Sequence, residues 1–131
     1  VMIKWLDCIR TGKSPLIYGD GSTTMDFVYV RDIARANIAA LQADVTDESF
    51  NIGNCEETSL KQLLEVLLRV NGSDLKPEHR EENSINPVSR RLAGIDKARQ
   101  LLGFTPTIGL EEGLKELSDW YFSKIKQTVT A

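Results

Sequence analysis

Apolar side chains recur three and four residues apart in several stretches of the chain, which is the spacing of an amphipathic helix. The first such stretch covers residues 2–9 and ends before Gly12, a residue suited to the left-handed turn that closes a helix. A second stretch covers residues 60–68, where Ser59 and Gln62 match a capping box. The pattern therefore predicts helices over both stretches.

Three further helices are predicted on weaker patterns. Asp32 is expected to be the N-cap of one, and Asp96 is expected to cap a short helix over residues 97–102, which Gly103 ends. The last helix is marked by apolar residues between Leu110 and Ile125. On the helix after Asp32, the residues expected on one face are Ile33, Ala36, Ala40 and Leu41.

Short runs of β-branched and aromatic residues separate the helical stretches. We expect strands over residues 15–18, 26–30 and 49–53, a strand near residues 75–78, and an extended segment over residues 89–95. Because such runs alternate with helices, the fold class is predicted to be α/β, with short strands and about five helices.

A glycine-rich turn precedes the run of residues 26–30. Gly19 and Gly21 permit the positive φ of a tight turn, and the Asp20 side chain can bond its own backbone. Turns held by a rigid scaffold often carry function. The alternative is that this one is only a hairpin turn.

Length and charge limit the function. The 131 residues suit a single domain, and the net charge of −3 gives no overall attraction for nucleic acid or an anionic membrane. No apolar run approaches the roughly 20 residues of a membrane span, so we expect a cytoplasmic protein. Cys8 and Cys55 lie far from each other and from His79, so they are interpreted as ordinary half-buried thiols and no metal site is expected.

Cofactor motifs are missing from the sequence. No Gly-x-Gly-x-x-Gly follows a predicted strand, and Gly12-Lys13-Ser14 ends a helix instead of opening one. None of the three tyrosines has a Lys four residues later. No residue is therefore assigned as catalytic or cofactor-binding.

Seven short motifs, in this order and spacing, resemble the C-terminal part of the NAD-dependent epimerase/dehydratase family, the extended short-chain dehydrogenases that act on nucleotide sugars. The motifs are residues 15–21, residues 26–30 with Asp32, residues 50–53, the capped helix from Ser59, residues 90–93 with 96–98, residues 102–104 with Pro106, and residues 110–120. The resemblance covers nearly the whole chain.

The resemblance implies a two-part enzyme. In this family an N-terminal Rossmann half binds NAD and supplies a Tyr-x-x-x-Lys pair for acid and base chemistry. Residues 1–131 are therefore expected to be a single substrate-binding domain, similar to that of a UDP-glucose 4-epimerase, without the NAD-binding half. By itself it should be inactive and bind no NAD. The first helix begins without a capping residue before Met2, as in a chain cut from a longer protein.

The resemblance also implies the substrate contacts. Leu16 and Tyr18 match positions that line the nucleotide base, and Phe27 matches a position beside the same pocket. Arg90 matches a residue that contacts the diphosphate, and Arg91 is the second choice. Many relatives carry an additional Arg where this chain has Met25, which puts the choice of a diphosphate sugar in question.

Plainer interpretations stand beside these. Arg90 and Arg91 would also suit a solvated strand edge, and Tyr18 and Phe27 a core. Asp26 and Asp32 are interpreted as turn and cap residues, and Trp5 and Trp120 as packing residues. In an alternative function the chain is a stand-alone binding module, a homodimer through the surfaces around Trp5 and Trp120.

Overall fold

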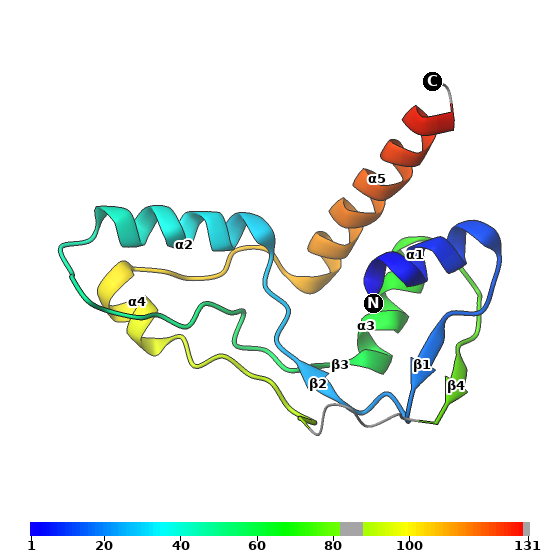
Figure 1. The fold of residues 1–131 in the computed structure, drawn as a ribbon, viewed down its shortest axis with the longest axis horizontal. Helices are drawn as coiled ribbons and strands as arrows, with labels where there is room; N and C mark the ends of the chain where they lie inside the picture. The colour runs from blue at the N-terminus through cyan, green and yellow to red at the C-terminus, as the bar shows by residue number, and fades with distance from the viewer. Residues whose placement is uncertain (82–87, 130–131) are drawn as a thin grey trace.

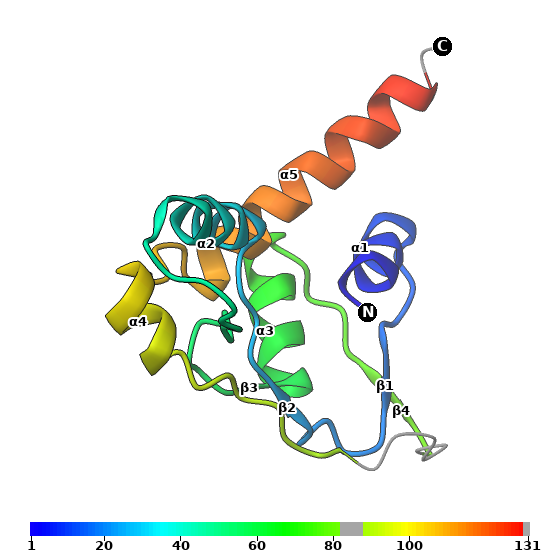
Figure 2. The ribbon, with the colours of Figure 1, turned by 60° about the vertical axis from the view of Figure 1, so that its left-hand side comes forward.

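The computed structural model describes residues 1–81 and 88–129 and has two lobes joined by extended segments (Figure 1). One lobe contains α1 (Met2–Thr11), β1 (Leu16–Tyr18), α3 (Leu60–Val70) and β4 (Glu78–Arg80). The other contains α2 (Val30–Gln42) and α4 (Asp96–Leu102). The last helix, α5 (Leu110–Val129), starts between the lobes, and its second half projects away from the body (Figure 2).

α1 packs on the first lobe through Trp5. Its side chain is buried, and its indole Nε1 donates a hydrogen bond to the Leu16 carbonyl at 2.9 Å, which ties the helix to β1. Gly12 ends the helix with φ 67°, as predicted. The core of this lobe consists of Trp5, Leu6, Ile17, Leu63, Leu64, Leu67 and Leu114.

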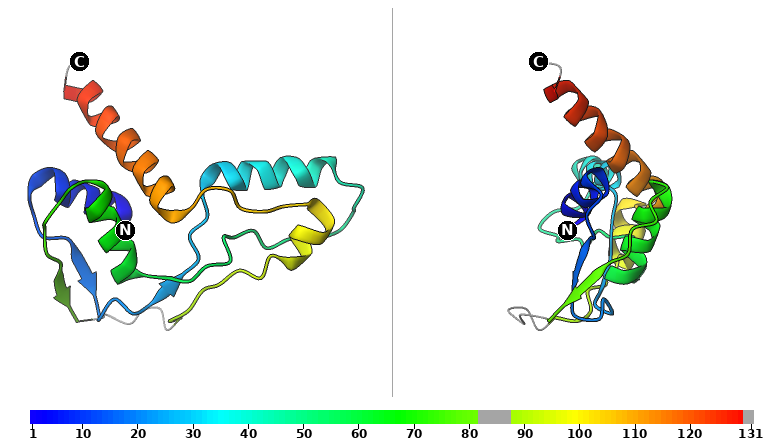
Figure 3. Two further views of the ribbon diagram at one scale, coloured as in Figure 1. Left: turned by 180° about the vertical axis from the view of Figure 1, so that it is seen from behind. Right: turned by 90° about the vertical axis from the view of Figure 1, so that its right-hand side faces the viewer.

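The strands form two small sheets in the described part of the chain. β1 pairs in parallel with β4, with Ile17 opposite His79, at one end of the molecule (Figure 3). β2 (Thr24–Met25) pairs antiparallel with β3 (Thr58–Ser59), and Thr24 also bridges to Arg90. The strand expected over residues 15–18 is confirmed, and the one expected near residues 75–78 begins only at Glu78. Five helices and these short strands confirm the predicted α/β class.

Two predicted strands are wrong. Residues 26–29 have no strand partner, and Val30 is already the first residue of α2. Residues 49–53 are also outside any strand. Both runs have the composition of a strand, but a strand forms only where a neighbouring backbone takes up its hydrogen bonds.

The first turn of α2 differs from the expectation. Tyr29 occupies the N-cap position without a side-chain capping bond, and Asp32 lies inside the helix, where it is fully buried. Ala36 is buried as predicted, whereas Leu41 is 86% exposed. The apolar stripe of this helix is therefore narrower than the one expected.

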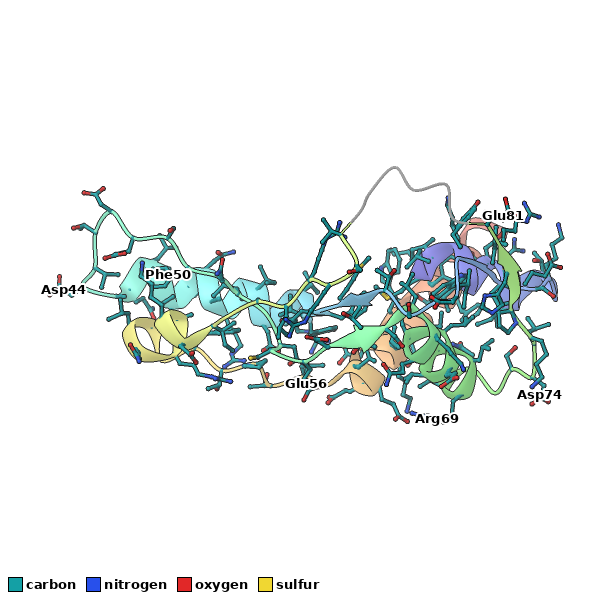
Figure 4. All side chains as sticks on the ribbon, turned by 90° about the horizontal axis from the view of Figure 1, so that it is seen from below. Asp44, Phe50, Glu56, Arg69, Asp74 and Glu81 are labelled. Carbon is teal, nitrogen blue, oxygen red and sulfur yellow. The ribbon has the colours of Figure 1, made fainter. Side chains whose placement is uncertain are left out.

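The core of the second lobe is formed around α4. This helix begins at Asp96 and ends at Gly103 with φ 62°. Its N-cap position is occupied by Ile95, so the capping role expected for Asp96 is wrong. The core of this lobe consists of Ala36, Ile95, Ala98 and Phe104, with Phe50 packed against them. Figure 4 shows Phe50 beside α2 and α4, in the opposite half of the molecule from Arg69.

The expectations for the two tryptophans and the two cysteines have mixed outcomes. Trp5 is a packing residue as predicted, but Trp120 is 53% exposed. Cys8 is half-buried as expected, but Cys55 is exposed. Among the described residues, no helix is both long enough and apolar enough to cross a membrane.

The capping box at α3 yields a stability prediction. Ser59 Oγ accepts from the Gln62 backbone N–H at 3.1 Å, and Gln62 Oε1 accepts from the Ser59 N–H at 2.9 Å. Ser59→Ala removes the first bond and is expected to lower the free energy of unfolding by about 1 kcal/mol in urea titrations. Ser123→Ala, on the exposed side of α5, is the control and should change it by less than about 0.5 kcal/mol. Equal stability losses in the two variants would contradict the capping role.

Candidate functional site

An open cavity of about 530 Å³ lies between β2 and the segment that follows residue 89. Its lining residues come from three parts of the chain that are distant in sequence: Met25, Asp26 and Phe27; Ile52 and Gly53; and Arg90, Arg91, Leu92 and Ala93. The structure therefore brings together Phe27, Arg90 and Arg91, three of the five residues assigned from the sequence.

The backbone around Thr24 holds this segment in place. The Thr24 N–H donates to the Ser89 carbonyl at 3.0 Å, and the Arg91 N–H donates to the Thr24 carbonyl at 3.0 Å. The extended conformation expected around residue 90 is confirmed at this bridge. Consequently the two arginines start from a fixed backbone.

The glycine turn before β2 is built as predicted. Gly19 and Gly21 have φ of 74° and 78°, and Asp20 Oδ1 accepts from the Ser22 N–H at 2.8 Å. Hydrogen bonding from Ser22, through its side chain first and then its backbone N–H, holds the pKa of Asp20 below its ordinary value. The Lys61 N–H then donates to the Gly21 carbonyl at 3.1 Å, so the turn is anchored on α3.

Asp26 is one of the residues that line the cavity. Its carboxylate accepts backbone N–H groups from Asn54 at 2.8 Å, Cys55 at 2.9 Å and Ala93 at 3.3 Å. Gly53 fits here because it has no Cβ: one would lie 2.5 Å from Asp26 Oδ2 and 2.5 Å from the Ala93 Cβ. Asp26 thus joins two loops, which agrees with the structural role expected from the sequence.

The two arginines differ in their partners. Arg90 has a side chain that is 66% exposed, and its Nε donates to Glu57. Arg91 is exposed and forms no ion pair with any residue that the structure describes. Both arginines therefore line the cavity and are exposed to solvent.

Leu16 and Tyr18 lie on β1 and do not line this cavity. Leu16 is half-buried, and Tyr18 is 54% exposed and stands opposite Arg80 in the register with β4. Tyr18 is therefore a surface residue and not a core aromatic. Phe27 is partly buried against the core of the first lobe.

A second cavity, of about 260 Å³, lies on the other side of Phe27 and has an apolar lining. Its lining includes Met2, Leu114 and Leu117. The Tyr29 hydroxyl and Arg31 both donate to Glu116, and the hydrogen bond to this carboxylate raises the pKa of Tyr29. This cavity has no cationic group in its lining and suits a phosphate poorly.

Asp32 connects α2 to the segment before α5. Its carboxylate accepts from the Thr107 N–H at 2.9 Å, the Ile108 N–H at 3.1 Å and the Thr107 hydroxyl at 2.8 Å, and it pairs with Arg35. Burial alone would raise the pKa of Asp32, but these hydrogen bonds outweigh burial and hold the pKa below its ordinary value. Asp32 is a structural carboxylate.

Among the residues not assigned to the site from the sequence, Gly53 and Glu57 shape it most directly. Gly53 was interpreted only as the end of a strand, although a glycine there also permits the close approach of Asp26 and Ala93. Glu57 has no sequence pattern that marks it, because a single acidic residue in a polar loop is common. Its partner Arg90 is 33 residues away.

Two features of known cofactor sites, a cluster of metal ligands and a glycine turn that opens a helix, are missing from the described residues. No group of His, Cys, Asp and Glu in residues 1–81 and 88–129 could hold a metal ion. A dinucleotide needs a glycine turn that opens a helix, but Gly19 and Gly21 lead into β2. The N-terminus of α3 is already occupied by its own capping box.

Comparison with known proteins finds relatives that share one family. Residues 1–53 match the NAD dependent epimerase/dehydratase family. A UDP-glucuronate 4-epimerase from Thermodesulfobacterium geofontis is 38% identical over 119 residues, which is 90% of this chain and 35% of that protein.

Solved structures share the fold. A UDP-glucose 4-epimerase from Thermotoga maritima, solved with UDP-glucose, superposes with a TM-score of 0.83 at 35% identity, over 92% of this chain and 38% of that one. A UDP-glucuronic acid 4-epimerase from Bacillus cereus, solved with NAD, also gives 0.83, at 27% identity over 94% of this chain and 39% of that one. This chain therefore spans little more than a third of the length of these relatives. The resemblance to the NAD-dependent epimerase/dehydratase family is thus confirmed, in sequence and in fold.

Proposed function

We propose that this chain is the substrate-binding portion of an NAD-dependent nucleotide-sugar epimerase, similar to a UDP-glucose 4-epimerase. It binds the nucleotide diphosphate sugar, while an N-terminal Rossmann half supplies NAD and the acid and base groups. The observation that supports this most is the pair of exposed arginines, Arg90 and Arg91, that line a cavity beside Phe27.

Each assigned residue has a role in this proposal. The planar guanidinium of Arg90 donates parallel hydrogen bonds to phosphate oxygens, and Arg91 adds a second positive charge. The exposed ring of Tyr18 stacks on the base with Leu16 beside it. Met25 lines the cavity where many relatives have an Arg, so phosphate binding rests on Arg90 and Arg91.

The diphosphate contact can be tested by calorimetry. The 131-residue chain is expected to bind UDP-glucose with a Kd of about 0.1–1 mM, since half of the site is contributed elsewhere. Arg90→Ala should weaken the binding of UDP-glucose about 10-fold, because a charged hydrogen bond is lost, and should leave the binding of uridine unchanged. Arg99→Ala is the control, because Arg99 pairs only locally with Asp96. No binding at several millimolar, or equal losses in both variants, would contradict the proposal.

Under the same proposal, the chain by itself does not bind NAD, because the residues that the structure describes contain no glycine turn of the kind that binds a dinucleotide. Titration with NAD followed by tryptophan fluorescence should show no saturable change. It also includes a cytoplasmic location, which the free thiols of Cys8 and Cys55 support. Saturable binding of NAD would assign part of the cofactor site to this chain.

A stand-alone binding or dimerisation module is the second candidate, and the exposed ring of Trp120 favours it. Trp5 does not contribute a surface to such a dimer because it is buried. Sedimentation of the chain and of Trp120→Ser tests the dimer: a dimer that Trp120→Ser dissociates would support it, and a monomer at every concentration would contradict it.

A further inference from the structure

Glu57 is hydrogen-bonded to both Thr24 and Arg90, and Arg90 lines the cavity. Its Oε1 accepts a hydrogen bond from Arg90 Nε, and its Oε2 accepts from the Thr24 hydroxyl at 3.4 Å. Its side chain is 32% exposed, about half as much as that of Arg90. Figure 4 shows the neighbouring Glu56 near the middle of the molecule, where the two lobes meet.

The pairing of the backbone segments explains why Glu57 and Arg90 meet. Thr24 is paired with Ser59 on one side and with Arg90 on the other, so three extended segments lie next to one another. The outer two are roughly 10 Å apart, twice the spacing of neighbouring strands. Glu57 immediately precedes β3, and the long Arg90 side chain therefore reaches it by lying across β2.

The bond to Nε leaves the phosphate-binding edge of Arg90 available. A guanidinium has five N–H donors in a planar fork, and Glu57 takes the one on Nε. The two terminal Nη groups remain as donors for a bidentate contact. We infer that Glu57 is a positioning residue, which holds Arg90 so that its terminal nitrogens face a phosphate; this inference rests on the proposed function above.

Restricting Arg90 before substrate arrives favours binding. A free arginine side chain loses rotamer freedom when it is immobilised on a ligand, and a side chain already held loses less. The opposite effect would be competition, in which Glu57 withholds Arg90 from the phosphate. Geometry favours positioning, because Glu57 is itself held by Thr24 and engages only one edge of the guanidinium.

Calorimetry on three variants tests the inference. Glu57→Ala is expected to weaken the binding of UDP-glucose about 5-fold and to leave the binding of uridine, which has no phosphate, unchanged. In the Arg90→Ala background, Glu57→Ala should cause no further loss, because its effect passes through Arg90. Glu56→Ala is the matched control. Within residues 1–81 and 88–129 the Glu56 carboxylate bonds only the Asn54 side chain, at 3.4 Å, and the Kd of this variant should equal that of the unchanged chain.

Several results would overturn the inference. If Glu57→Ala binds UDP-glucose as tightly or more tightly, Glu57 competes or has no role. If it weakens the Arg90→Ala variant further, its effect is not through Arg90. If the unchanged chain binds UDP-glucose but one of these two results is found, only the inference about Glu57 is overturned and the proposed function stands. If the unchanged chain does not bind UDP-glucose, the inference and the proposed function are both overturned. If Glu57→Ala does not fold, Glu57→Gln, which removes the charge and keeps an acceptor, replaces it in the same cycle.

Discussion

Replacing Asp32 with Asn is expected to lower the free energy of unfolding by about 3 kcal/mol. The carboxylate is fully buried and accepts from the Thr107 N–H, the Ile108 N–H and the Thr107 hydroxyl. The Asn amide turns an N–H₂ toward donors and leaves Arg35 without its anionic partner. Urea unfolding at pH 7 measures the loss.

Two comparisons separate this effect from a general change in charge. Asp96→Asn, also in the first turn of a helix, has an exposed side chain and should cost less than about 0.5 kcal/mol. Because the folded-state pKa of Asp32 is lowered, its contribution is fully present above the unfolded value of about 3.9 and is lost as the pH falls through the lower folded value. The gap between the original chain and Asp32→Asn should therefore narrow below about pH 4. An equal gap at pH 7 and pH 2.5 would contradict an ionised Asp32.

Replacing Gly53 with Ala is expected to lower the free energy of unfolding by about 2–3 kcal/mol and to weaken the binding of UDP-glucose more than about 10-fold. The added Cβ would lie 2.5 Å from both Asp26 Oδ2 and the Ala93 Cβ, so one loop must move. Movement of Ala93 carries Arg91 and Arg90 with it. Urea unfolding and calorimetry measure the two effects.

Gly94→Ala is the matched control for Gly53→Ala. It alters the next loop position after Ala93, where a Cβ would meet no atom within 4 Å. We expect it to leave both the stability and the Kd unchanged. If Gly53→Ala behaves in the same way, the close packing of Asp26, Gly53 and Ala93 does not shape the site.

The helices could be predicted because their determinants are local. The capping box of Ser59 and Gln62 and the glycine C-caps at Gly12 and Gly103 lie within a few residues of the ends that they define. Residues 26–30 and 49–53 have the composition of strands, but whether they pair depends on backbone elsewhere. For that reason both predictions failed.

The site was predictable only in part, for the same reason. Arg90, Arg91 and Phe27 were assigned through motif resemblance, and the structure brings them to one cavity. An Asp before an apolar stripe is typical of an N-cap, which is why the sequence predicts that role for Asp32, but its partners at residues 107 and 108 are 75 and 76 residues away. No local pattern reveals such a partner.

The most direct test of nucleotide-sugar binding is a ¹H–¹⁵N correlation spectrum of the chain titrated with UDP-glucose. Two groups of backbone signals should shift together: Gly53 and Arg90 to Ala93 around the diphosphate and sugar, and Tyr18 with Gly19 around the base. Uridine alone should shift only the second group. Shifts confined to Leu114 and Leu117, at the apolar cavity, or no shifts at several millimolar UDP-glucose, would contradict binding at the Arg90 site.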